Sequence, residues 1–98
     1  MREHPLKIFE KIDPELFKLV QNTNALALAD GALTRKLKLL IAMALDASHG
    51  ASGGVAALAR QAVAAGATKQ EVAEALRVTH YICGIGSIHT AYATSKYN

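Results

Sequence analysis

The chain has 98 residues, of which 51% are hydrophobic and 5% aromatic, and it carries a formal net charge of +3. This length fits one domain, spanning residues 1–98, and so mild a positive charge is not by itself the signature of a nucleic-acid-binding protein. The single cysteine excludes an intramolecular disulfide and any Cys-x-x-Cys redox centre, and it fits a reducing cytoplasm. No apolar run is long enough to predict a membrane-spanning helix or a signal peptide, so we expect a cytoplasmic protein with no membrane partner.

The first third of the chain predicts two helices. Pro5 opens a short segment with one apolar side that runs to Ile12. Asp13-Pro14-Glu15 is a strong signal for the start of the second helix. Aspartate caps well, proline suits the first helical position, and glutamate favours the positive end of a helix.

The next predicted helix is apolar on nearly every side. Thr34 can cap it, and the segment from Leu37 to Leu45 follows with few polar residues, before His49-Gly50 ends it. A helix of this kind is normally buried on all sides, and one short chain can hardly cover it. We therefore expect a homo-oligomer, with a trimer or hexamer as its form.

Two further helices follow a corner rich in small residues. Ser52 is expected to cap a helix from Gly53 to Ala65, and Gly66 ends it. Thr68 and Glu71 form the pattern of a capping box, in which each side chain satisfies a backbone donor of the other residue.

The helix behind this capping box carries its apolar side up to His80 and Cys83. The segment Gly84-Ile85-Gly86 breaks or bends the chain, and a last helix runs from Ser87 to about Lys96. No alternation of strand type competes with the helical spacing. The predicted fold class is all-α, a compact bundle of five or six helices.

The order of these signals resembles the core of the carboxymuconolactone decarboxylase and alkylhydroperoxidase D-like family. The matching segments are Leu33–Lys36, Ile41–Leu45, Ala62–Gly66 and Thr68–Leu76, and the match ends near Gly84. The resemblance implies an oligomeric, all-helical subunit. For the redox branch of the family, the resemblance also implies the activity of a peroxiredoxin-type thiol peroxidase, that is, an antioxidant alkyl hydroperoxide reductase.

That redox activity depends on residues that this chain lacks at the matching positions. The family's two cysteines correspond to Ala51 and Gly54, its following histidine to Leu58, and its upstream glutamate to a position near Leu39. Only a thiolate attacks peroxide, and a second thiol must resolve the sulfenic acid. The decarboxylase branch has no cysteine pair but keeps the histidine, so the leucine at position 58 also argues against lactone decarboxylation.

Four other side chains are the catalytic candidates: His49, His80, Cys83 and His89. His80 and Cys83 are three residues apart, so they share a helix face, and they can equally be interpreted as core residues. A histidine that titrates near neutral pH could serve an acid–base pocket. Histidine and cysteine are also zinc ligands, but their wide spacing in this sequence gives no metal motif, and we expect no metal and no cofactor.

Three classes of function remain open. The first is a family member that has lost its redox centre and binds a small molecule, apolar or acidic, or serves in assembly. The second is an enzyme with relocated acid–base chemistry at His49, His80 and Cys83, decarboxylase-like or with residual antioxidant activity. The third is a basic module for nucleic acid or an acidic partner, which would require six cations to share one surface: Lys7, Lys11, Lys18, Arg35, Lys36 and Lys38. We interpret the last three as a solvated helix face and expect no nucleic-acid partner.

Overall fold

The computed structural model describes residues 7–84, and within them all regular structure is helical. The helices are α1 (Lys7–Ile12), α2 (Pro14–Leu28), α3 (Arg35–Ser48), α4 (Ser52–Ala64) and α5 (Lys69–Cys83). The prediction of an all-α chain is confirmed. The beginning of the first predicted helix, at Pro5, and the whole of the last, Ser87 to Lys96, lie outside the described residues.

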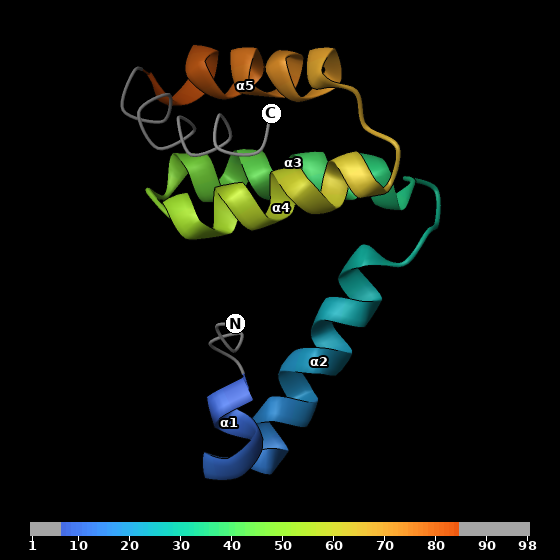
Figure 1. Cartoon of the computed structure of the whole chain (residues 1–98), viewed down its shortest axis with the longest axis vertical. Coiled ribbons are helices and arrows are strands. Elements are labelled where there is room, and N and C mark those ends of the chain that lie inside the picture. The colour runs from blue at the N-terminus through green and yellow to red at the C-terminus, as the bar shows by residue number, and fades with distance from the viewer. Residues whose placement is uncertain (1–6, 85–98) are drawn as a thin grey trace.

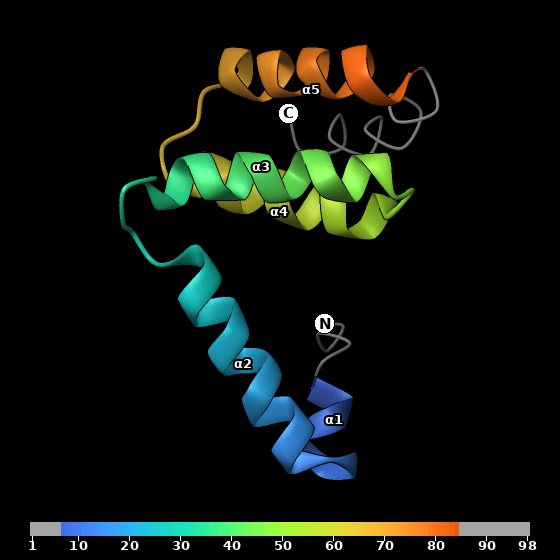
Figure 2. The same ribbon diagram turned by 180° about the vertical axis from the view of Figure 1, so that it is seen from behind.

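Helix α3 is the centre of the arrangement, because it contacts α2, α4 and α5. Helix α4 runs back beside α3, and α5 lies along the pair on another side (Figure 1). Helices α1 and α2 contact each other and extend away from the remaining helices, and we call residues 7–28 the arm (Figure 2). In both views the arm and α5 lie on opposite sides of the α3–α4 pair.

The hydrophobic core lies mainly between α3 and α4. Its largest fully buried side chains are Leu39, Met43 and Val55. The alanines Ala47, Ala59 and Ala62 are also buried there, and small side chains at a contact let two helices approach closely. The core therefore depends on close helix packing more than on bulky residues.

The outer side of α3 is not covered within one chain. Leu37, Ile41 and Leu45 follow one another at four-residue spacing, and they are 42%, 44% and 56% exposed. The helix that looks apolar all round thus keeps one apolar stripe exposed in the single chain.

The helix ends follow the local sequence with one exception. The Thr34 and Thr68 hydroxyls accept hydrogen bonds from the backbone N–H groups of Leu37 (3.2 Å) and Glu71 (3.0 Å), as predicted. The prediction that Ser52 caps α4 is wrong. The N-cap is Ala51, and no side chain caps this helix among the described residues. The turn after α3 is so short that Ser52 already belongs to the first turn of α4.

Candidate functional site

The corner between α3 and α4 is where the family resemblance places the chemistry. The backbone N–H of His49 donates to the Leu45 carbonyl (3.1 Å), and Gly50 reverses the chain with φ of 77°. The Ala51 N–H then donates back to the Asp46 carbonyl (2.9 Å). Gly50 matches the predicted left-handed position, since a residue without Cβ adopts it at little cost.

A carboxylate occupies the space beside Gly54, the position that corresponds to the family's second cysteine. A Cβ on Gly54 would collide with Asp46 Oδ2 and would come within 2.9 Å of Asp46 Cγ. The side chain of Asp46 therefore packs directly against the first turn of α4. Sequence reasoning missed Asp46, although it is the one acidic residue in α3 and lies close before the corner.

The other positions of the family's redox site are also occupied by ordinary packing residues. Leu39 is fully buried in the core, and Leu58 is half-buried and packs against it. Ala51 is exposed and carries only a methyl group. None of these three side chains can carry a proton or act as a nucleophile.

The predicted catalytic side chains among the described residues lie at the ends of α3 and α5 and are not enclosed in a pocket. His49 follows α3, while His80 and Cys83 belong to the end of α5, and both ends lie on the same side in Figure 1. All three residues are exposed, so the interpretation of His80 and Cys83 as core residues of the single chain is wrong. Residues 7–84 contain no group of three or more histidine, cysteine or acidic side chains placed to hold a metal ion. His89 lies outside the described residues.

An apolar groove of about 380 Å³ runs between α3 and α5. Its walls are formed by Leu37, Leu40, Ile41, Ala44, Glu71, Glu74, Ala75 and Val78. The two carboxylates come from α5, and every other lining side chain is aliphatic. The groove therefore suits an apolar occupant, and its carboxylates would repel an anion.

Glu71, at one wall of this groove, joins α5 to α3. Its Oε1 accepts a hydrogen bond from the Thr68 N–H (2.9 Å), which completes the predicted capping box, and its Oε2 pairs with Lys36 Nζ (2.9 Å). The pKa of Glu71 is lowered, first because the carboxylate accepts the Thr68 N–H and next because Lys36 donates to it.

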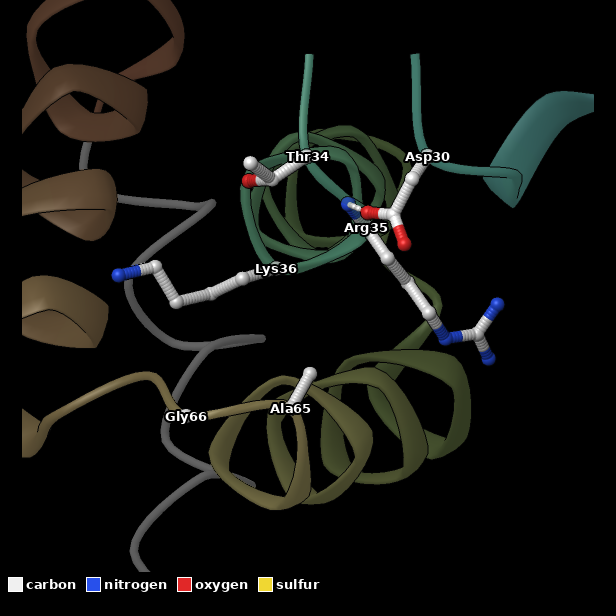
Figure 3. Close-up of a pocket in the computed structure, with 6 residues that line it drawn as sticks. All are labelled: Asp30, Thr34, Arg35, Lys36, Ala65 and Gly66. Atoms are coloured by element: carbon white, nitrogen blue, oxygen red, sulfur yellow. Dashed lines mark hydrogen bonds between the residues drawn. The ribbon is translucent and has the colours of Figure 1, made fainter.

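A polar depression of about 450 Å³ lies at the beginning of α3, near the end of α4. Figure 3 shows the side chains of Arg35 and Lys36 pointing in opposite directions from it. Lys36 Nζ is bound to Glu71, and Lys38 Nζ donates to the carbonyl of Ala29 (2.6 Å). Arg35 and Lys36 therefore face different ways, and the charge of Lys36 is paired with that of Glu71.

Comparison with known proteins agrees with the all-helical fold. The family model described as carboxymuconolactone decarboxylase family matches residues 14–96. Among solved structures, the apo form of a carboxymuconolactone decarboxylase family protein from Legionella pneumophila is similar, with 31% sequence identity and a TM-score of 0.86. The match covers 94% of this chain and 86% of that one. No curated protein sequence matches at a significant level.

Within residues 7–84, none of the helices has the length and apolar character needed to cross a membrane.

Proposed function

Because this chain belongs to the carboxymuconolactone decarboxylase family, we propose that it is a non-redox member of that family and works as a self-assembling helical subunit. The observation that carries the non-redox part is the Asp46 carboxylate beside Gly54. A cysteine side chain at position 54 would require this carboxylate to move. The corner is thus built around an acid and a glycine rather than around a pair of thiols.

The remaining cysteine does not replace the missing pair. Cys83 lies at the exposed end of α5, whereas Ala51 and Gly54 lie at the start of α4. A peroxidase cycle at Cys83 would need a resolving thiol from a second molecule, because the chain has no other cysteine.

The uncovered side of α3 supports the assembly part of the proposal. Leu37, Ile41 and Leu45 present a continuous apolar stripe, whereas isolated exposed apolar residues would need no explanation. We propose a trimer or hexamer, in which this stripe is buried.

Binding of a small apolar molecule is the second candidate, and the groove between α3 and α5 favours it. Ligand pockets in proteins are concave and mostly apolar, with a few polar groups that fix orientation. Glu71 and Glu74 would supply those groups for a neutral or cationic molecule.

A thiol-dependent hydroperoxide reduction assay tests the non-redox part. We expect no turnover above the uncatalysed background for the wild type or for Cys83→Ser, whereas a family member with both thiols serves as the positive control. Turnover of the wild type that disappears in Cys83→Ser would make Cys83 a peroxidatic thiol, and turnover that survives would reveal a route without thiols. Either result would overturn the proposal.

Sedimentation velocity of the purified chain at micromolar concentration tests the assembly part. We expect a single species with the mass of a trimer or hexamer. A monomer under these conditions would contradict the proposed assembly, while the absence of peroxidase activity would stand unaffected.

A further inference from the structure

No side chain of the arm formed by α1 and α2 is fully buried by its own chain, although Leu28 at the end of α2 packs against the core. Its exposed large apolar residues are Ile8, Phe9, Ile12, Leu16, Leu19 and Leu26, which are 38–80% exposed. Isolated helices shorter than about 12–15 residues are marginal in water, and most helical stability in proteins comes from packing an apolar face. The arm therefore needs a surface to pack against.

The connection between α2 and α3 holds the arm away from its own chain's groove. Asp30 Oδ1 accepts a hydrogen bond from the Arg35 N–H (2.7 Å), and Lys38 Nζ donates to the Ala29 carbonyl (2.6 Å). The Gly31 N–H donates to the Leu33 carbonyl (3.0 Å) within the same connection. The arm leaves on the side of the α3–α4 pair opposite α5 (Figures 1 and 2). Within residues 7–84, the arm therefore does not cover the α3–α5 groove of its own chain.

The exposed area of the chain is large enough for these surfaces to be buried against a second copy. The chain exposes 6992 Å², whereas a compact monomer of 10.4 kDa exposes about 5400 Å². The excess is roughly 1600 Å², and a stable protein–protein interface buries about 800 Å² of each partner. The excess is large enough for a chain that gives one surface to a neighbouring copy and receives another from it.

We propose that the arm of one subunit packs its apolar side into the α3–α5 groove of a second copy of this chain. The groove offers Ile41, Ala44 and Val78 to the incoming helix, and α2 brings Leu16, Leu19 and Leu26. Each subunit donates one arm and receives one, and a head-to-tail exchange of this kind forms a ring when the rotation between neighbouring subunits closes. This inference rests on the proposed assembly and names the two surfaces that produce it.

Crosslinking of the unmodified sequence tests the exchange directly. Heavy-isotope-labelled and unlabelled chains are unfolded, mixed in equal amounts, refolded and treated with a lysine-reactive crosslinker. The arm carries Lys18, and Lys36 and Lys69 lie at the first turns of α3 and α5. We expect peptides that link Lys18 to Lys36 or Lys69 with one heavy and one light half.

Matched substitutions test the two surfaces separately. Leu19→Asp on the arm and Ile41→Asp in the groove should each weaken association about 30-fold or more, as expected for loss of a central interface side chain. Val63→Asp on α4 is the control, because Val63 is 50% exposed and belongs to neither surface. It should leave the assembly intact. Circular dichroism checks that each variant stays helical.

The outcomes separate the exchange from the wider proposal. An oligomer whose Lys18 crosslinks stay within one chain, or which Leu19→Asp and Ile41→Asp do not weaken, would overturn the exchange while the assembly stands. A wild-type chain that sediments as a monomer would overturn both. If a substituted chain does not fold, the isotope pattern of the crosslinks in the unmodified sequence still tests whether arms are exchanged.

Discussion

At the scale of single residues, the contact between Asp46 and Gly54 is the defining feature of the corner between α3 and α4. The backbone conformation does not require a glycine at position 54, because Gly54 lies inside α4 and its φ is not positive. Its role is steric, since it leaves room for a carboxylate from the preceding helix. An acid beside the first turn of a helix also lies near the positive end of the helix dipole.

Replacing Gly54 with alanine should therefore destabilise the fold. The added methyl group must displace the Asp46 carboxylate, and overpacking of this kind costs about 1–3 kcal/mol. Chemical denaturation of the variant measures this loss of unfolding free energy. In an Asp46→Ala background the same substitution should cost nothing, so the two changes should be coupled by about 1–3 kcal/mol.

Gly53 provides the matched control for this prediction. A Cβ added there meets nothing within 4 Å, and Gly53 also lies in the first turn of α4. Gly53→Ala should leave stability unchanged or raise it by up to about 1 kcal/mol, because alanine loses less backbone entropy in a helix. Equal losses at positions 53 and 54 would refute the steric role of Gly54.

At the scale of elements, short-range signals decide where most of these helices begin. Thr34 and Thr68 cap α3 and α5 through hydrogen bonds that span three residues, so their partners are visible in the sequence. Lys36 adds a long-range contact, because it binds the capping glutamate of α5 from the first turn of α3. Glu71 thus stabilises the start of one helix and holds that helix against another.

The ionisation of Glu71 should make stability depend on pH. Since its pKa is lower in the folded chain, its contribution is complete above the pKa of an unfolded glutamate, about 4.3, and is lost as the pH falls through the folded-state value. Glu71→Gln keeps a side-chain oxygen for the capping box but removes the charge. Its Tm should be lower than that of the wild type at neutral pH, and the two curves should converge in acid.

Glu74→Gln is the control on the same helix. Glu74 is exposed and accepts a hydrogen bond from Gln70 Nε2 (3.1 Å), with no contact to α3 through that bond. This variant should keep the acid dependence of the wild type. If Glu71→Gln keeps it too, the link between Glu71 and Lys36 does not contribute to stability.

At the scale of the whole molecule, the chain is more extended than its length requires. Its radius of gyration is 14.2 Å, whereas a compact domain of this length has about 12.6 Å. The arm and the outer side of α3 together keep many large apolar side chains exposed. Apolar surface of this extent favours association, so the self-association proposed above has its physical basis in the shape of the subunit.

Much of the fold could be predicted because its causes are local. The starts at Asp13, Thr34 and Thr68 and the reversal at Gly50 all follow from residues within a few positions. Ser52 was misassigned because serine is a good cap by type, while the length of the turn before it depends on how α3 and α4 pack.

The candidate site was harder to predict, because its contacts join residues that are distant along the chain or of unremarkable type. The sequence shows that positions 51, 54 and 58 lack the redox residues of the family. It does not show that the Asp46 carboxylate fills the space at Gly54, or that His80 and Cys83 are exposed, since both depend on side-chain packing.

Residue type and short spacing are enough to predict the all-α class, most helix boundaries, the family and the absence of a thiol pair. The three-dimensional packing was needed to learn which side chains of α3 stay exposed and where the arm points. Those features depend on helix packing and on the hydrogen bonds around Asp30, which tie the direction of α2 to α3. The same apolar pattern would suit a buried helix or an interface, and only the fold distinguishes the two.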